Sequence, residues 1–289
     1  MMTADVLSTR QVATLLGVGE ATVKRWADAG EIDCFRTPGG HRKFRLRDVT
    51  TFVHDRRYQA TGPLPGGVPS EASEPGTRAI DYFEAAALKG DAPALVAQLS
   101  LLRLRGTELP DLFDHVVSPA LRRIGDAWEK HKLTIAEEHV AAQTVIDAIA
   151  RAQPLAEPPG EPVRPDRGVA IVAAVAGELH DIPARMSACL LRARGFEVLA
   201  PLAQTPARDL ADLVLRSRAV LVVLSSTVQS EVDEQVALAC TAAREVGGRV
   251  VVGGSAMRNA RLPAEAKVLF SLRDLWTESD TAGRKRPRA

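Results

Sequence analysis

The chain has 289 residues, enough for two or three domains, and its formal net charge is only +1. This balance excludes a uniformly basic nucleic-acid-binding protein, and three widely spaced cysteines exclude a disulfide framework or a cysteine-rich zinc site. No signal peptide is visible and no apolar run reaches the roughly 18 residues that a membrane span needs, so we expect a cytoplasmic protein. Cys189 and Cys240 lie in helical patterns and are expected in the core.

The first thirty residues predict two short helices separated by a tight turn. Residues 8–16 carry an apolar face behind a capping residue, Ser8 or Thr9. A glycine turn at 17–19 follows, and a second helix over 20–29 ends before Gly30. Two helices with this connection are typical of a helix-turn-helix. The second helix directs Val23 and Trp26 inward, and its outward residues are Thr22, Lys24 and Arg25.

Residues 34–45 predict a basic hairpin next to the second helix. Pro38-Gly39-Gly40 separates two short extended runs, and the segment from Asp33 to Arg47 holds five basic residues and one acid. A closing helix is expected over 48–57. A basic hairpin beside a recognition helix is suited to contact phosphates or the minor groove. The alternative is that these charges only solvate a small helical domain.

Residues 7–57 resemble the MerR family of winged helix-turn-helix regulators, above all in the segment Thr-Pro-Gly-Gly-His-Arg-Lys-Phe. The resemblance implies a DNA-binding domain over 1–60 and a dimer that reads two half-sites of double-stranded operator DNA. The DNA contacts that it implies are Thr22, Lys24, Arg25, Arg42 and Lys43.

A helical region is expected after a flexible linker over 61–76. The helical pattern runs over 77–153, with Pro119 kinking or dividing the third segment. Short connections favour an antiparallel four-helix bundle. The predicted helices are Arg78–Lys89, Ala92–Arg105, Glu108–Glu129 and Ile135–Ala152.

Polar residues near the start of the fourth predicted helix have two interpretations. Thr134 and Glu137 have the spacing of a capping box, which begins the helix. Glu138 then falls on an apolar stripe, where a carboxylate is costly without a partner, and His139 lies on the neighbouring face. Taken alone, these acids suit an ordinary helix N-terminus, and Trp128 suits a core position.

A proline-rich linker over 154–167 precedes alternating strands and helices over 168–280. This alternation predicts a five-stranded, flavodoxin-like (Rossmann-type) parallel sheet, followed by a basic tail over 281–289. The predicted strands are Val169–Val175, Phe196–Leu199, Ala219–Leu224, Arg249–Val252 and Lys267–Phe270. The predicted helices are Ile182–Arg194, Pro206–Ser217 and Val232–Glu245.

Three loops of this sheet are expected to share one edge. His180 follows the first strand, residues 225–227 follow the third, and Gly253-Gly254 follow the fourth. Ligands of such sheets bind at the carboxyl ends of the strands. A neutral histidine binds transition metals when a carboxylate, here Glu178 or Asp181, holds its second nitrogen. The plainer interpretation is a generic α/β domain with a surface histidine.

The loop set resembles cobalamin-binding domains, and Trp128-x9-Glu138-His139 resembles the helical cap of light-sensing adenosylcobalamin regulators of the CarH/LitR type. This resemblance implies adenosylcobalamin as the cofactor and His180 as the lower cobalt ligand. It also implies that Trp128, Glu138 and His139 shield and contact the adenosyl group. The residues implied around the nucleotide tail and the lower ligand are Glu178, Ser225, Thr227, Gly253 and Gly254.

Two positions depart from that family pattern. The family has glycine three residues after the ligand histidine, where this chain has Pro183, which fixes φ and lacks an N–H. In the light sensors a second histidine directly follows the tryptophan and ligates cobalt after photolysis. Glu129 occupies that place here, and His131 stands two residues further on as a possible substitute upper ligand.

The leading hypothesis is a cobalamin-dependent repressor, a ligand-dependent dimer or tetramer that binds operator DNA in the dark and releases it in light. The second hypothesis is the same architecture with a degenerate site that answers to another ligand or partner. A cobalamin enzyme subunit is disfavoured by the DNA-binding unit and by the absence of room for a catalytic barrel.

Overall fold

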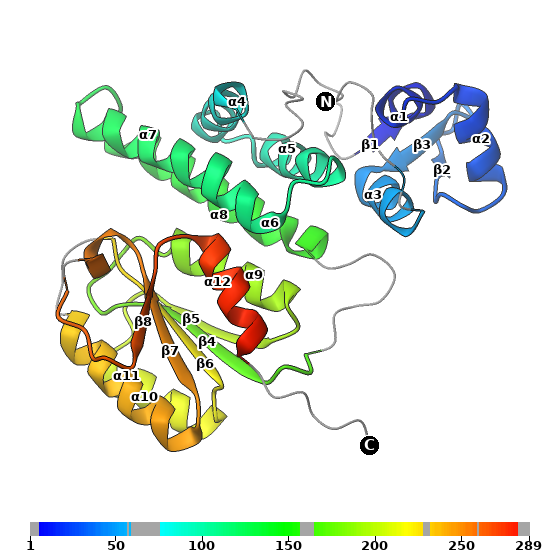
Figure 1. The fold of residues 1–289 in the computed structure, drawn as a ribbon. Helices are drawn as coiled ribbons and strands as arrows, with labels where there is room; N and C mark the ends of the chain where they lie inside the picture. Colours follow the sequence, from blue (N-terminus) through cyan, green and yellow to red (C-terminus); the bar gives the residue numbers. More distant parts are fainter. Residues whose placement is uncertain are drawn as a thin grey trace, which may run out of the picture. The chain divides into compact units, whose positions relative to one another are not determined.

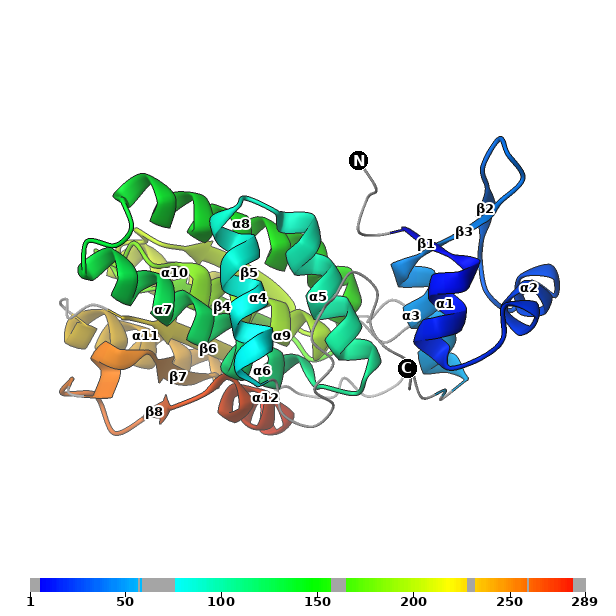
Figure 2. The same cartoon turned by 90° about the horizontal axis from the view of Figure 1, so that it is seen from above.

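The computed structural model describes residues 6–56, 58, 76–156, 165–227, 232–258 and 260–282. The chain divides into two compact units, Met1–Pro162 and Val163–Ala289, whose elements are shown in Figures 1 and 2. Most of the two predicted linkers and of the basic tail lies outside the described residues. Within the described ranges, none of the helices has the length and apolar character to cross a membrane.

The first unit begins with a small helical domain that carries a hairpin. Its elements are β1 (Val6–Ser8), α1 (Thr9–Leu16), α2 (Glu20–Asp28), β2 (Phe35–Arg36), β3 (Arg42–Arg45) and α3 (Leu46–Asp55). The hairpin β2–β3 is the predicted wing, and β1 adds a third antiparallel strand on the other side of β3. This strand was not predicted, because three residues are too short to show an alternating pattern.

Local caps set the limits of α1. Ser8, not Thr9, is the capping residue: its hydroxyl accepts from the Gln11 N–H, and the Gln11 side chain accepts from the Ser8 N–H. Gly17 ends the helix in the left-handed conformation at φ 67°. The predicted helix-turn-helix is therefore formed by the residues that its sequence pattern indicated.

The core of this small domain is shared with the helical bundle that follows. Leu15, Phe44 and Val49 are fully buried in it. The same apolar cluster contains three residues of the bundle helix α5, namely Ala97, Leu101 and Leu104. The winged domain and the bundle therefore share buried apolar surface, which the predicted domain boundaries did not anticipate.

The bundle contains the four predicted helices, of which the third is divided. Its elements are α4 (Thr77–Leu88), α5 (Ala92–Leu104), α6 (Leu109–Leu112), a π-helical turn η2 (Phe113–Val117), α7 (Ser118–Glu129) and α8 (Ile135–Ala156). Pro119 lies in the first turn of α7, directly after the π turn. A proline ring cannot be accommodated within a continuous helix, and the π turn adjusts the chain before it.

The second unit confirms the predicted flavodoxin-like sheet. Five parallel strands lie in the order β5-β4-β6-β7-β8. Figure 1 shows α9 and α12 on one face of the sheet and α10 and α11 on the other. The strands are β4 (Val169–Ala174), β5 (Glu197–Leu202), β6 (Leu221–Ser225), β7 (Arg249–Gly253) and β8 (Ala266–Leu269). The helices are α9 (Ile182–Ala193), α10 (Ala207–Ser217), α11 (Val232–Val246), η3 (Ser255–Arg258, a 3-10 turn) and α12 (Leu272–Thr281).

Both core cysteines were predicted correctly. Cys189 on α9 and Cys240 on α11 are buried and not disulfide-bonded. Burial raises the pKa of the Cys240 thiol, and the nearby Glu265 carboxylate raises it further. A thiol of this kind stays protonated and acts as a small apolar side chain.

The final helix α12 is held on α9 by Arg194. The Arg194 guanidinium donates to the carbonyl of Trp276 at 3.0 Å and to the Asp280 carboxylate at 2.8 Å. It also lies 3.8 Å from the centroid of the Trp276 ring. The sequence analysis missed this helix, although Ser271 and Asp274 form a capping box at its start. Its attachment to α9, in contrast, depends on contacts between residues more than eighty positions apart.

Replacing Arg194 with alanine is expected to lower the unfolding free energy by about 1–3 kcal/mol, because a cation–π contact and hydrogen bonds to a charged group are lost together. Urea denaturation of the full chain measures this change. The matched control is Arg244→Ala, which removes an exposed ion pair with Glu265 at 3.5 Å and is expected to change the stability by less than about 0.5 kcal/mol. Equal effects of the two variants would contradict the assignment.

Candidate functional site

The loops after β4 and β6 meet at the carboxyl edge of the sheet. These strands are parallel neighbours although β5 lies between them in the sequence, so the direction in which successive strands are added to the sheet reverses here. Ala174 is paired with Ser225, and Ser225 with Gly253. The predicted loops after the first, third and fourth strands therefore lie side by side, at the point where sheets of this topology bind ligands.

A buried carboxylate joins two of these loops. Glu178 is 1% exposed, and its Oε1 lies 2.6 Å from Nδ1 of His180 and accepts from the His180 N–H at 2.8 Å. Its Oε2 accepts from the N–H of Thr227 at 2.6 Å and from the Thr227 hydroxyl at 2.8 Å. The two carboxylate oxygens thus bind one loop each, and satisfied hydrogen bonds offset the cost of burying the charge.

This arrangement determines the orientation of His180. With Nδ1 directed at a carboxylate, the proton is placed on Nδ1 and the lone pair on Nε2. The imidazole side chain is 63% exposed, so Nε2 is accessible to a ligand. Asp181, the other predicted carboxylate, pairs with Arg185 at 2.6 Å. Of the two predicted partners, Glu178 is the one in contact with the histidine.

His180 is a single candidate metal ligand, with Glu178 as the carboxylate that orients it. Within the described residues there is no group of three or more His, Cys, Asp or Glu side chains arranged to hold a metal ion.

Ser225 and Ser226 are buried and directly precede Thr227, which bonds the Glu178 carboxylate. The Ser225 residue is only 5% exposed, yet its hydroxyl has no hydrogen-bond partner among the described residues. Buried hydroxyls are rarely left without a partner, and an exception calls for a ligand or an ordered water. This unpartnered hydroxyl is a candidate hydrogen-bond partner for a polar group of a ligand.

Gly253 is the last residue of β7 and Gly254 follows it, and the two glycines have different structural reasons. A Cβ on Gly254 would lie 2.1 Å from the Ser226 carbonyl oxygen, and its φ of 104° also disfavours any side chain. Gly254 is therefore required by the approach of two loops, whether or not a ligand binds. A Cβ on Gly253 would make only an ordinary contact with the Leu269 carbonyl oxygen at 3.7 Å.

Pro183 is compatible with a regular loop. It lies in the first turn of α9, where a helix makes no use of the missing N–H. Its carbonyl accepts from the Ser187 hydroxyl at 2.9 Å. The departure from glycine at this position does not disturb the contacts between Glu178 and His180.

Two residues that contact this edge were missed by the sequence analysis. Gln235, in the first turn of α11, accepts from the Ala176 N–H at 2.5 Å, and Ser255 donates to the Thr227 carbonyl at 2.8 Å. Their polar side chains look ordinary in sequence. The signal for Gln235 is that it falls on the otherwise apolar, buried face of α11.

In the first unit, Trp128 and His131 line one pocket. It has a volume of about 690 Å³ and is formed by the end of α7, the α7–α8 loop and the start of α8. The Trp128 side chain is 43% exposed, and Ile135 across the pocket is 59% exposed. His131 has a left-handed backbone at φ 54°, which ends α7: the N–H of His131 donates to the Trp128 carbonyl at 2.9 Å, and the N–H of Lys132 donates to the Ala127 carbonyl at 2.8 Å.

The polar residues at the start of α8 fall into two groups, one that caps the helix and one that is at least partly exposed. Thr134 and Glu137 form the predicted capping box, and hydrogen bonds from the Thr134 backbone and hydroxyl lower the pKa of Glu137. Glu138 is partly buried and lies 3.6 Å from Nε2 of His139, whose side chain is 73% exposed. Glu137 therefore has a structural role, whereas Glu138 and His139 are available to a ligand.

The winged domain presents its predicted DNA contacts unequally. Lys24 and Arg25 are exposed on α2, and Thr22 and Lys43 are partly exposed. The Arg42 side chain is only 17% exposed and is paired with Asp28 at the end of α2. Arg42 therefore connects the wing to α2, and this contact determines how the two elements are placed for DNA.

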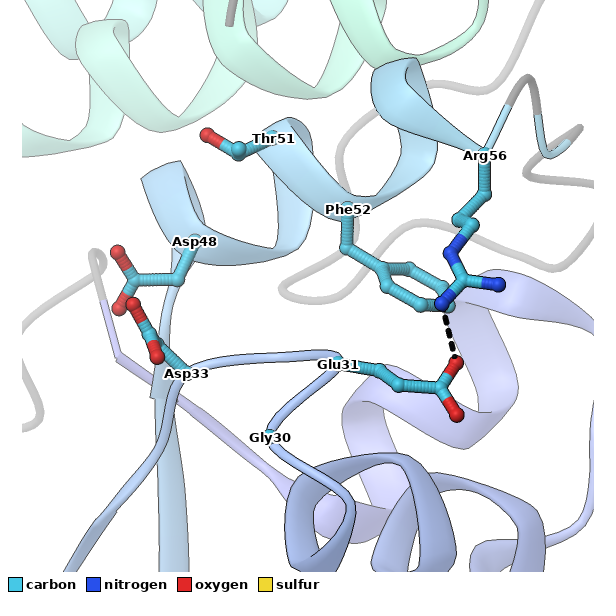
Figure 3. Close-up of a pocket in the computed structure, with 7 residues that line it drawn as sticks. All are labelled: Gly30, Glu31, Asp33, Asp48, Thr51, Phe52 and Arg56. Atoms are coloured by element: carbon cyan, nitrogen blue, oxygen red, sulfur yellow. Dashed lines mark ion pairs between the residues drawn. The ribbon is translucent and has the colours of Figure 1, made fainter. Parts of the chain in front are cut away.

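An acidic pocket occupies another part of the same domain (Figure 3). It has a volume of about 200 Å³, and the side chains of Asp33 and Asp48 point toward one another across it. Arg56 is paired there with Glu31 at 2.8 Å. Carboxylates repel phosphates, so DNA is expected on the α2 and wing surfaces and not at this pocket.

Comparisons with known proteins match both parts of the first unit. Residues 6–57 match the helix-turn-helix domain family, and residues 79–153 match the B12 binding domain family. The chain is 29% identical over 282 residues to the HTH-type transcriptional repressor CarH of Myxococcus xanthus, covering 88% of this chain and 90% of that protein. It is 40% identical over 50 residues to the transcriptional repressor DcmR of Methylorubrum extorquens, covering 17% and 19%.

A solved structure supports the fold of a large part of the chain. The monomethylamine corrinoid protein of Methanosarcina barkeri matches with a TM-score of 0.56 and 16% identity, covering 69% of this chain and 96% of that one. These matches confirm the resemblance to a helix-turn-helix repressor that carries a B12 binding domain, and the solved structure supports the fold. Both of these relatives are named as transcriptional repressors.

The contact at Gly254 is testable by substitution. Gly254→Ala is expected to lower the unfolding free energy by about 2–4 kcal/mol, because the methyl group collides with the Ser226 carbonyl and the backbone is left-handed. Gly177→Ala is the control: it has a similar backbone, with φ 82°, but open space around its Cβ, so about 1–2 kcal/mol is expected. Chemical denaturation compares the two, and an equal loss would mean that the collision is relieved.

Proposed function

We propose that this protein is a DNA-binding transcriptional repressor, and not an enzyme, whose state is controlled by cobalamin. The observation that carries the proposal is the contact of the buried Glu178 carboxylate with both His180 and Thr227. It fixes a histidine with Nε2 accessible at the ligand-binding edge of a flavodoxin-like sheet. The same chain contains a winged helix-turn-helix domain, and its curated relatives are named as repressors.

The residues at the sheet edge fit a corrinoid. His180 would hold the lower face of the cobalt through Nε2, with Glu178 fixing the ring and Thr227 fixing Glu178. The orphaned Ser225 hydroxyl would bond the nucleotide tail, and Gly253 would leave space for it. The Thr227 hydroxyl donates to Glu178, so its principal role is to support the carboxylate.

The helical unit supplies candidates for the upper face. Trp128 offers an exposed aromatic surface, and Glu138 and His139 offer polar contacts for an adenosyl group. When bound, adenosylcobalamin supplies a cobalt–carbon bond that visible light breaks. His131, in the pocket beside Trp128, is the candidate upper ligand in the light-exposed state.

The regulatory part of the proposal is a ligand-dependent homo-oligomer. A dimer or tetramer would place several winged domains on one operator, and linked weak contacts strengthen binding by multivalency. Cobalamin can shift this equilibrium only if it binds one assembly state more tightly than the other. The phosphate contacts are assigned to Lys24, Arg25 and Lys43, with Thr22 beside them.

The alternative is a degenerate site that answers to another ligand or partner. The main reason for that alternative was Pro183, and this residue is accommodated in the first turn of α9 without disturbing His180. The cobalamin hypothesis is therefore favoured.

Cobalamin binding is tested by visible absorption. The protein mixed with adenosylcobalamin in the dark is expected to stay coloured after desalting, and its spectrum to change on illumination. His180→Ala is expected to weaken binding about tenfold to hundredfold, and Asp181→Asn, which leaves Glu178 and His180 in place, is the control. A colourless desalted wild-type protein would refute the cobalamin proposal, and a light-stable spectrum would refute the light response.

The contact between Asp28 and Arg42 predicts that removing an acidic side chain weakens DNA binding, where charge alone would predict stronger binding. Asp28→Asn removes a negative charge near the DNA-binding surface, which alone would strengthen DNA binding. If the pair positions the wing, the variant instead binds operator-containing DNA several-fold more weakly. Fluorescence anisotropy at several salt concentrations measures both effects. Glu20→Gln, which removes a like charge from α2, is the control and is expected to bind equally or slightly better.

A further inference from the structure

Gln235 links two loops at the carboxyl edge of the sheet. Its side chain is 1% exposed, in the first turn of α11. Oε1 accepts from the Ala176 N–H at 2.5 Å, and Nε2 donates to the Thr205 carbonyl at 3.4 Å. Ala176 follows β4 and Thr205 follows β5, and these two strands are neighbours in the sheet. A buried amide with both ends bonded restrains both loops.

The loop that contains Thr205 is in an unfavourable backbone conformation. Leu202 and Gln204 have φ values of 62° and 64°, although neither is glycine. Such a conformation is strained for a residue with a side chain and persists only where surrounding contacts hold it. The bond from Gln235 to Thr205 is one of these contacts, directly after the strained residues.

The loop that contains Ala176 leads to the histidine. Val175 donates to the Ser225 carbonyl at 3.0 Å, Ala176 donates to Gln235, and Glu178 donates back to the Val175 carbonyl at 3.0 Å. Gly177 completes this turn in the left-handed region at φ 82°. The turn delivers Glu178 to its buried position, and Glu178 orients His180. The position of His180 therefore depends on a backbone turn that Gln235 holds from α11.

We propose that Gln235 is a positioning residue for the His180 loop, holding the Ala176 turn so that His180 is oriented to ligate a metal. The proposal rests on the proposed function in one respect, the identification of that metal as the cobalt of cobalamin. Gln235 acts through Ala176 and Glu178 and does not itself contact the imidazole.

The test compares two buried glutamines. Gln235→Met keeps the length and helical preference of the side chain but removes both hydrogen bonds. Gln98→Met is the matched control: Gln98 is also fully buried, donates to the Ala79 carbonyl at 2.7 Å, and belongs to the helical bundle. Both variants lose a buried amide, but Gln235 is bonded through both Oε1 and Nε2, whereas Oε1 of Gln98 has no partner among the described residues. Gln98→Met therefore controls for the loss of a buried glutamine away from the sheet edge, not for the size of the stability change.

The first readout needs no cofactor. Hydrogen exchange in the cobalamin-free full chain is expected to accelerate in residues 175–180 of Gln235→Met and to stay unchanged there in Gln98→Met. Unchanged exchange in that segment of Gln235→Met would overturn the proposal, whatever the protein binds.

The second readout is the axial ligand of bound cob(II)alamin. With ¹⁵N-histidine-labelled protein, the hyperfine pattern in electron paramagnetic resonance changes only if a protein histidine ligates the cobalt. The label is expected to alter the pattern of wild type and Gln98→Met. Gln235→Met is expected to show a smaller histidine-ligated fraction and about tenfold to hundredfold weaker binding.

The outcomes separate the two proposals. Wild-type histidine ligation with unchanged ligation and affinity in Gln235→Met refutes the role of Gln235 alone. A wild-type protein that binds no cob(II)alamin, or binds it without a histidine effect, refutes the cobalamin assignment, and hydrogen exchange then decides whether Gln235 holds the loop.

Discussion

The buried carboxylate of Glu178 is the constraint on which the sheet edge depends. An ionised side chain that is 1% exposed would destabilise the fold by several kcal/mol without compensation. Here it accepts hydrogen bonds from the backbone and side chains of both His180 and Thr227. These bonds join the loops after β4 and β6 at the topological switch point. The buried carboxylate of Glu178 therefore also orients the His180 imidazole. Its burial depends on hydrogen bonds from both loops, because each carboxylate oxygen is bonded by one of them.

The loops around Glu178 are held by further contacts between one another. Gly254 allows its loop to approach the Ser226 backbone, and Ser255 bonds the Thr227 carbonyl. Gln235 restrains the turn before Glu178 from the other side. A ligand atom that such hydrogen bonds already hold in place avoids part of the entropic cost of ordering on binding. The buried Ser225 hydroxyl is the exception, because it lacks a partner among the described residues.

The DNA-binding half reconciles a nearly neutral chain with a polyanionic partner. Basic side chains on α2 and the wing are separated from the carboxylates of Glu31, Asp33 and Asp48, which gather around a pocket next to α3. One acid, Asp28, lies among the basic residues and pairs with Arg42, which places the wing. The winged domain also shares an apolar core with Ala97, Leu101 and Leu104 of α5. A change in the helical bundle can therefore reach the DNA-binding elements through packed side chains.

The sequence by itself determined what local patterns control: the helix-turn-helix with its glycine turn, the capping box at Thr134, the helical bundle, and the parallel sheet that follows from alternating strands and helices. Sheet topology then placed His180, Ser225 and Gly253 at one edge without any side-chain information. Only the tertiary structure decided between Glu178 and Asp181 as the partner of His180, assigned Arg42 to Asp28, explained Gly254, and revealed the attachment of α12 and the contacts of Gln235. These depend on contacts between residues distant in the chain, such as Glu178 with Thr227 and Arg194 with Asp280. Such contacts arise from the geometry of packed elements, which leaves no periodic signal in the residues themselves.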